Sequence, residues 1–336
     1  MTKTPIELLR NSAPAARPVI ALSEGSDPRV VAGALAAHNS GLTDIILVGP
    51  EDEVSSALAA EGISVGGGIE IHDPATSELT EMFAAEFLAL RKHKGVDEVK
   101  ARAAAETPLI YAAMLVRIGH ATGTVGGAVH TTGDVVRSAI QVIGMAPDAG
   151  MISSFFLMYP PDDAPDNARA MLYSDCGLVI DPSASELANI AETSAASARS
   201  LLQVEPKIAM LSFSTKGSAR HKAVDKVIEA TNTIRAKRPD LEVDGELQFD
   251  AAFVPTVGER KSPGSSVAGQ ANVMIFPNLD AGNIAYKITQ RLGGYAAIGP
   301  VMQGLAKPAN DLSRGCSADD VTQIIAVTVL QAQTAQ

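Results

Sequence analysis

The sequence predicts an α/β protein of two domains, and three features of the chain lead to this expectation. Its 336 residues exceed the size at which a single hydrophobic core usually stops growing. Hydrophobic residues make up 46% and charged residues 19%, which is typical of a globular rather than a disordered chain. Short apolar runs alternate with segments of helical spacing along the whole chain.

The chain opens with a predicted βαβ unit. Residues 18–22 and 44–49 are apolar runs, and residues 30–38 between them have helical spacing. Asp27 as N-cap and Pro28 at the first helical position form the expected start of that helix. We therefore expect two parallel strands joined by a right-handed crossover.

Further elements follow in the first half. Helical spacing is predicted over 77–91 and 96–118, with a basic run at 91–94 that we interpret as a solvated helix end. Residues 123–130 indicate a buried strand with closely packed glycines. A helix carrying Arg137 follows directly, at the sheet edge where open α/β proteins bind ligands.

A second series of elements begins after the break at 146–148 and ends at Gly299-Pro300. Its predicted strands and helices share the same alternation; they cover residues 151–160, 176–180, 183–202, 208–213, 224–235 and 273–276, followed by a helix with Tyr286, Lys287 and Arg291. We expect residues 1–148 with 300–336 to form one α/β domain and residues 149–299 to be inserted into it.

Two loops of this second series contain residues of functional interest. Residues 214–218 have the composition of a phosphate cradle but lack the full spacing of a P-loop, so an ordinary turn between strand and helix is favoured. The stretch 262–266, rich in Ser, Gly and Pro, is predicted to be flexible.

Charge and composition exclude several classes of function. A net charge of −11 and a pI near 5.0 argue against nucleic acid or an anionic membrane as partner, and the absence of Trp removes a stacking platform for bases. Cys176 and Cys316 match no metal or redox spacing, and no apolar run approaches the roughly 20 residues of a membrane span. We expect a cytoplasmic protein without a metal site.

The densest group of reactive side chains lies at 310–320. Ser317 and Asp320 have the spacing of a capping box in front of an apolar helix, with Asp in place of the usual Glu. Ser313 and Arg314 are not needed for a cap, and an arginine beside a helix N-terminus can bind an anion. Cys316 could be a nucleophile with a lowered pKa, yet no histidine lies nearby in sequence to serve as its base.

The chain resembles the phosphate acetyltransferases along its whole length. The resemblance rests on the run 310–317 with Asp320, on 126–130 leading to Arg137, and on 213–218. Further matching segments lie at 23–25, 90–93, 245–250 and 271–278. It implies reversible acetyl transfer between acetyl phosphate and coenzyme A through a ternary complex, with coenzyme A as substrate and no tightly bound cofactor.

The resemblance also implies an architecture and a set of site residues. Family members are similar in fold to isocitrate and isopropylmalate dehydrogenases, with two α/β domains, a cleft between them and a homodimeric assembly. The implied catalytic residues are Ser313, Asp320 and the phosphate-handling Arg314. The implied binding residues for the substrates are Arg91, Arg137 and Arg291.

Elementary chemistry sets one condition on this hypothesis. The thiol of coenzyme A has a pKa of about 8.5, so a base must take its proton at neutral pH, and Asp320 is the implied base. A carboxylate at a helix N-terminus beside Arg314 is stabilised in its charged form, so it needs partial loss of water to act as a base.

Three other hypotheses stay open at this point. One is a transferase for butyryl or branched acyl groups, and another is a noncatalytic module that senses acetyl-CoA. The third is a metal-dependent dehydrogenase of the similar fold, which requires a cluster of Asp ligands that the sequence does not display.

Overall fold

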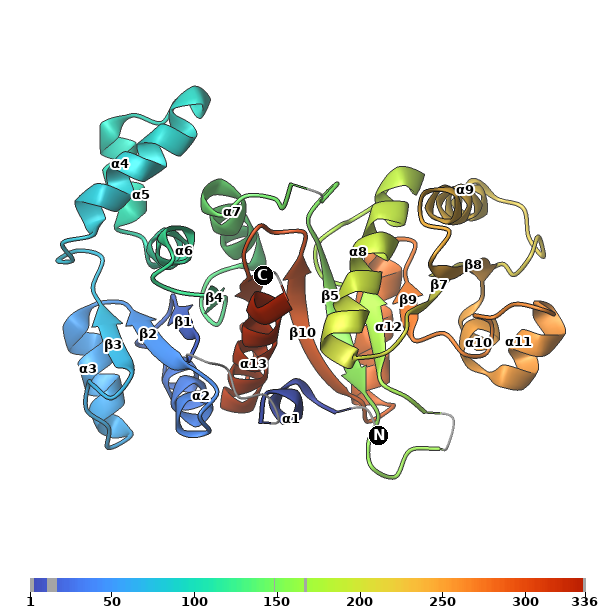
Figure 1. Cartoon of the computed structure of the whole chain (residues 1–336), viewed down its shortest axis with the longest axis horizontal. Coiled ribbons are helices and arrows are strands. Elements are labelled where there is room, and N and C mark those ends of the chain that lie inside the picture. The colour runs from blue at the N-terminus through green and yellow to red at the C-terminus, as the bar shows by residue number, and fades with distance from the viewer. Residues whose placement is uncertain (1–2, 11–16, 148, 166–167, 335–336) are drawn as a thin grey trace. The chain divides into compact units, whose positions relative to one another are not determined.

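The computed structural model describes residues 3–10, 17–147, 149–165 and 168–334, and the chain divides into two compact units (Figure 1). We call Pro5–Pro147 with Leu305–Gln336 the terminal unit, and Asp148–Gly304 with the first four residues the central unit. The chain thus leaves the central unit after Gly304 rather than at residue 300. No described helix combines the length and apolar character needed to cross a membrane.

The terminal unit contains a five-stranded sheet in which every neighbouring pair is parallel. In spatial order its strands are β11 (Ala309–Asp311), β4 (Gly123–Gly126), β1 (Val19–Leu22), β2 (Asp44–Val48) and β3 (Ile69–His72). The central strand β1 ends in fully buried apolar residues because helices cover both of its faces. Since all strands run in one direction, their carboxyl ends meet at a single edge.

Helices surround this sheet. They are α1 (Pro5–Arg10), α2 (Pro28–Asn39), α3 (Glu51–Ala60), α4 (Thr80–Arg91), α5 (Glu98–Ala105), α6 (Pro108–Ile118), α7 (Thr132–Val142) and α13 (Ala318–Thr334), with the 3-10 turn η1 (Lys92–Lys94) after α4. The predicted βαβ opening is confirmed, and Asp27 caps α2 by accepting a hydrogen bond from Arg29 N. The long helix predicted over 96–118 is wrong: Pro108 begins a new helix, because its missing N–H suits the first helical position.

The central unit contains a six-stranded mixed sheet. In spatial order its strands are β10 (Ala296–Gln303), β5 (Ser153–Tyr159), β6 (Met171–Ser174), β9 (Val273–Ile275), β7 (Lys207–Leu211) and β8 (Glu242–Leu247). The pairs β10–β5 and β5–β6 are antiparallel, and the pairs from β6 to β8 are parallel. The parallel half carries the crossover helices.

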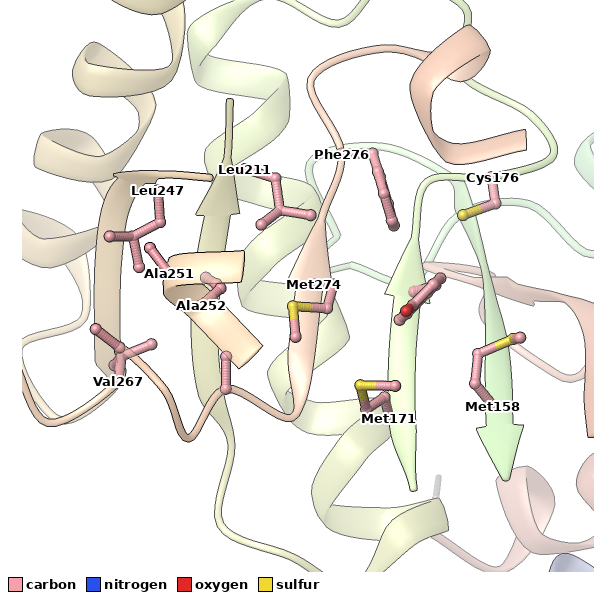
Figure 2. Close-up of a cluster of buried hydrophobic side chains, with 14 of the residues drawn as sticks. Met158, Met171, Cys176, Leu211, Leu247, Ala251, Ala252, Val267, Met274 and Phe276 are labelled. Carbon is pink, nitrogen blue, oxygen red and sulfur yellow. The ribbon is translucent and has the colours of Figure 1, made fainter. Parts of the chain in front are cut away.

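A hydrophobic cluster fills one face of this sheet. Figure 2 shows Met158, Met171, Met274 and Leu211 side by side across four strands, with α10 (Phe249–Phe253) in front of the sheet and α8 (Ala184–Leu202) behind it. The remaining helices of the unit are α9 (Lys222–Lys237), α11 (Pro255–Lys261) and α12 (Leu279–Arg291). The capping box predicted at Ser183 is confirmed by its reciprocal bonds with Glu186.

Four expectations from the sequence are wrong in detail. The strand predicted over 123–130 ends at Gly126, because the next N–H groups bond to a side chain instead of a neighbouring strand. The predicted strand 176–180 is a loop, and the strand lies earlier, at β6. Gly299-Pro300 does not end the series but lies in β10, at a shift of register. The stretch 262–266 is anchored, since Ser262 and Ser265 both donate to Asp244.

Candidate active site

Three loops meet at the carboxyl edge of the terminal sheet. They follow the neighbouring strands β1, β4 and β11 and comprise residues 23–27, 127–131 and 312–317. Backbone bonds tie them together: Ser23 N donates to Val125 O at 3.1 Å, and Leu312 N donates to Gly126 O at 2.7 Å. The segments 23–25 and 126–130, which carry part of the family resemblance, are thereby brought beside the start of α13.

A buried carboxylate organises the loop after β4. Glu24 accepts hydrogen bonds from the backbone N–H groups of Gly127, Ala128, Val129 and His130 at 2.6–3.0 Å. The His130 Nδ1 atom lies 2.7 Å from the same carboxylate. A turn of consecutive N–H groups is a typical anion site, and here a side chain of the protein itself is the anion.

Arg29 joins the loop after β4 to the loop after β11. Its guanidinium donates to Ala128 O at 2.9 Å and to Arg314 O at 2.7 Å. Two further bonds from the guanidinium reach Asp27, and the bond from Arg29 lowers the pKa of that carboxyl group. The guanidinium is thus held in place and links the loop after β4 to the backbone that directly follows Ser313.

The loop after β11 presents two of the implied catalytic side chains to solvent. Ser313 is exposed, and its Oγ accepts only a weak bond from Gly315 N at 3.2 Å. The exposed guanidinium of Arg314 has no hydrogen-bond or ion-pair partner within the described part of the chain. Both groups are available for a ligand at the N-terminal end of α13.

Asp320 caps that helix, as the sequence predicted. Its Oδ2 accepts bonds from Ser317 N and Ser317 Oγ, both at 2.8 Å, and Asp320 N donates back to Ser317 Oγ at 3.2 Å. The residue is exposed, and its second carboxylate oxygen makes no hydrogen bond to any of the residues that the structure describes. Capping therefore occupies one oxygen and leaves the other available.

The thiol of Cys316 is not activated. Burial raises the pKa of Cys316, and the favourable charge of Arg29 does not overcome that effect. The expectation of a lowered pKa is wrong because the side chain packs into the core beneath the loop, where only 6% of the residue is exposed.

The implied binding arginines lie on different elements. Arg91 ends α4, and Arg137 lies on α7, where it pairs with Asp134 at 2.7 Å. Arg291 is the last residue of α12 and belongs to the central unit, whereas the other implied residues belong to the terminal unit.

Two buried polar atoms lie beneath the three loops without a hydrogen-bond partner among the described residues. They are Ser23 Oγ and Asp311 Oδ1. The other oxygen of Asp311 accepts a bond from Thr132 Oγ1 at 2.6 Å. Burial, the largest cause, raises the pKa of Asp311 to about 7, and the neighbouring charge of Glu24 acts in the same direction.

The central unit has two buried acids of its own, Asp244 and Glu246, in strand β8. Glu246 accepts bonds from Ser214 Oγ and Gly217 N, both at 2.8 Å. The suspected phosphate cradle at 214–218 therefore has one of its N–H groups already bonded to a side chain. Asp244 pairs with Lys216 and with Arg235.

A cavity of about 750 Å³ lies in the central unit where β7 and β9 end. Its walls combine aromatic rings, among them Phe213 and Phe249, with the amino groups of Lys222 and Lys226. Lys226 is bonded to Asp181 at 2.7 Å, whereas Lys222 forms no ion pair with any of the described residues. The cavity thus offers flat apolar surfaces beside a free positive charge.

Nothing in the described residues groups three or more His, Cys, Asp or Glu side chains as a metal would require. Sequence reasoning missed Glu24, Arg29 and Asp311 as parts of the site. Their positions could have been suspected, because Glu24 and Asp311 lie within or just beyond the carboxyl ends of strands that the terminal sheet brings to the same edge, and Arg29 lies in the first turn of the helix after β1.

Comparison with known proteins agrees with this arrangement. The family model "Phosphate acetyl/butaryl transferase" matches residues 5–329. A phosphate acetyltransferase of Thermoanaerobacterium thermosaccharolyticum is 47% identical over 314 residues, which cover 94% of this chain and 95% of that protein. A phosphotransacetylase structure from Streptococcus pyogenes superposes with a TM-score of 0.90 at 42% identity, covering 98% of both chains.

A more distant structure indicates the breadth of the fold. A putative 4-hydroxythreonine-4-phosphate dehydrogenase from Salmonella typhimurium superposes with a TM-score of 0.52 at 15% identity, covering 96% of this chain and 100% of that one. The α/β fold is therefore shared with dehydrogenase-like proteins. The chain itself belongs to the phosphate acetyl/butyryl transferase family.

Proposed function

We propose that this chain is a phosphate acetyltransferase, which interconverts acetyl phosphate and coenzyme A with acetyl-CoA and phosphate. The observation that carries the proposal is the exposed pair Ser313 and Arg314 on a short anchored loop, directly before the N-terminus of α13, in a chain of this family. We also propose that the protein acts in the cytoplasm as a homodimer.

The first chemical step is proton removal. Asp320, which uses one oxygen for capping, takes the proton of the coenzyme A thiol with its other oxygen. The thiolate then attacks the carbonyl carbon of acetyl phosphate. A sulfur–carbon bond forms, and the bond from that carbon to the bridging phosphate oxygen breaks.

Ser313 and Arg314 stabilise the negative charges that develop during this reaction. The Ser313 hydroxyl donates to the carbonyl oxygen as it becomes negative, and Arg314 binds the phosphate that departs with the bonding electrons. Because Arg29 holds Arg314 O, the backbone that carries both groups need not reorganise during the reaction.

The remaining implied residues contribute binding. Arg91 and Arg137 bind the phosphates of coenzyme A, and Arg291 adds a positive charge from the central unit. The cavity at Phe213 and Lys222, which lies within the central unit, has a chemistry that suits an aromatic base with a phosphate.

The test is thioester formation from coenzyme A and acetyl phosphate, followed by ultraviolet absorbance. We expect Ser313→Ala to lower kcat by about 100- to 1,000-fold, with both KM values nearly unchanged, because the lost bond acts in the transition state. Asp320→Asn should lower kcat by at least about 100-fold. An active Asp320→Asn enzyme would restrict that residue to its capping role.

The binding arginines give an independent readout in the same assay. Arg91→Ala and Arg137→Ala should raise the KM for coenzyme A by about tenfold or more, and the KM for acetyl phosphate much less. Arg10→Ala on α1 is a matched control for the loss of one positive charge from the terminal unit. The reverse pattern of KM values would mean that these residues bind acetyl phosphate.

Acyl specificity is tested by propionyl and butyryl phosphate in parallel. We expect acetyl phosphate to give the highest kcat/KM. A preference for the longer chains would establish the second activity of the family, transfer of larger acyl groups.

A further inference from the structure

Asp311, the last residue of β11, is a buried acid whose surroundings offer little compensation. Only 1% of the residue is exposed. Thr132 at the start of α7 bonds to Oδ2, while Oδ1 has no hydrogen-bond partner in the described part of the chain. A methyl group on Gly127 would lie 2.1 Å from Oδ1, so this oxygen faces the backbone of the loop after β4.

No cation is available to this carboxyl group. The elements that pack against β11 are β4, α7 and α13. Strand β4 has no charged residue, the charges of α7 are the mutual pair Asp134–Arg137, and α13 carries the acids Asp319 and Asp320 with no basic residue.

The nearest groups beyond these elements are already engaged. Glu24 holds the N–H groups of the loop after β4 and adds a second negative charge close to Asp311. His130 bonds to Glu24, and Arg29 is bonded to Asp27 and to two carbonyl oxygens. An ionised Asp311 would thus place a second negative charge in the interior beside Glu24. Because no cation balances that charge, its burial costs free energy.

A protonated Asp311 satisfies the same geometry. With a proton on Oδ2, the bond that Thr132 Oγ1 donates in the structure is reversed, so that Asp311 donates to Thr132 Oγ1, and Oδ1 rests against Gly127 without a net charge. The next residue, Leu312, bonds to Gly126 O, and Ser313 follows immediately. Asp311 lies at the junction between the sheet and the loop that carries Ser313, so its protonation state affects how that loop is held.

We propose that Asp311 is a positioning residue for acetyl transfer, which in its neutral form seals the loop of Ser313 and Arg314 against the loop after β4. Ionisation draws water to the carboxylate and loosens that seal, so the loop loses its fixed position as the pH rises. This role rests on the proposed function and is distinct from that of Asp320, which accepts a proton from substrate.

Linkage gives the sign of the effect. The pKa of Asp311 in the folded state lies near 7 and its unfolded value near 3.8. The folded protein thus binds more protons than the unfolded chain between these values. The folding equilibrium constant should fall by up to about tenfold per pH unit in this window and stay at the lower level above it.

The test compares wild type with Asp311→Asn, an amide that keeps the shape and cannot ionise. In wild type, kcat for thioester formation should decline with an apparent pKa near 7, at saturating coenzyme A and acetyl phosphate. In Asp311→Asn this decline should disappear, while the KM values stay within about twofold. Asp52→Asn on α3, an exposed acid, is the matched control and should retain the wild-type profile.

Two measurements separate this proposal from the proposed function. Urea unfolding between pH 4 and 8 should show a falling stability of wild type relative to Asp311→Asn, whether or not the protein makes thioester. Infrared difference spectra at pH 6 should show a protonated buried carboxyl band that is absent in Asp311→Asn.

The opposite results would overturn the positioning role. They are an unchanged pH profile in Asp311→Asn, equal pH dependence of the two stabilities, or a kcat for Asp311→Asn that is low at every pH. Loss of thioester formation in wild type would instead contradict the proposed function, and the stability measurement would still decide the state of Asp311.

Discussion

Asp311 in the terminal sheet and Asp244 in the central sheet are both buried aspartates in strands, yet their acidities shift in opposite directions. Burial raises the pKa of both. At Asp244, however, hydrogen bonds from Lys216 and Ser265 and the charge of Lys216 outweigh burial, so its pKa is lowered. Asp311 has one hydroxyl partner and a nearby carboxylate, so its pKa is raised to about 7. The number and charge of the partners, more than burial itself, decide which acid is ionised.

Glu24 extends this comparison because it lies beside Asp311, yet its carboxylate accepts hydrogen bonds from four backbone N–H groups. Glu24→Gln replaces a carboxylate by an amide whose NH2 group would face backbone N–H donors, which leaves several of them unsatisfied. We expect a loss of about 3–5 kcal/mol in unfolding free energy, measured by urea denaturation at pH 7. The exposed Glu53→Gln on α3 should change it by less than about 0.5 kcal/mol. Equal effects of the two substitutions would show that the cluster of N–H groups does not depend on Glu24.

The glycines of the corresponding loops give a second contrast. Gly127 has φ +107° and lies against Asp311 and the backbone of Leu312, whereas Gly217 has φ +81° with open space around its Cα. We expect Gly127→Ala to cost about 3 kcal/mol or more and Gly217→Ala about 1 kcal/mol, since only the first adds a clash to the unfavourable backbone angle. Thermal unfolding of the two variants measures the difference. Similar costs would mean that the β11 loop can move away from Gly127.

A third contrast concerns Asp244, the buried acid with charged partners. Asp244→Asn should lower the unfolding free energy by about 2 kcal/mol at pH 7, because the charged bonds with Lys216 and Arg235 are weakened. A folded pKa below the unfolded value contributes stability above about pH 4 that is lost as the pH falls further, so the two proteins should converge in acid. Stability that rises on this substitution would place Asp244 in the same class as Asp311.

Local patterns in the sequence predicted local structure well. Asp27 with Pro28, Ser183 with Glu186, and Ser317 with Asp320 are helix starts whose bonding partners lie within three residues, so spacing alone identifies them. The parallel strands β1 and β2 were also recognisable as apolar runs on either side of a helix.

Features that depend on distant partners could not be predicted. The sequence pattern of residues 127–130 suggested that the strand continues. Instead, their N–H groups bond to Glu24, which lies more than 100 residues earlier in the chain. The lowered pKa considered for Cys316 was wrong for a similar reason, because the burial that raises the pKa of this thiol cannot be read from its sequence neighbours. Ser313 and Arg314 stood out in the sequence because a helix cap does not need them, whereas their roles come from the family resemblance and stay predictions.

The order of the strands in the terminal sheet has a consequence for synthesis on the ribosome. The central unit is nearly continuous in sequence, whereas β11 lies at the edge of the terminal sheet and leaves the ribosome only after the whole central unit. Domains generally fold as units during synthesis. The central unit can therefore fold while β1 to β4 still lack their last strand and α13. The loop of Ser313 and Arg314 is among the last parts of the protein to reach its place, so a nascent chain acquires its reactive surface only when both units are essentially complete.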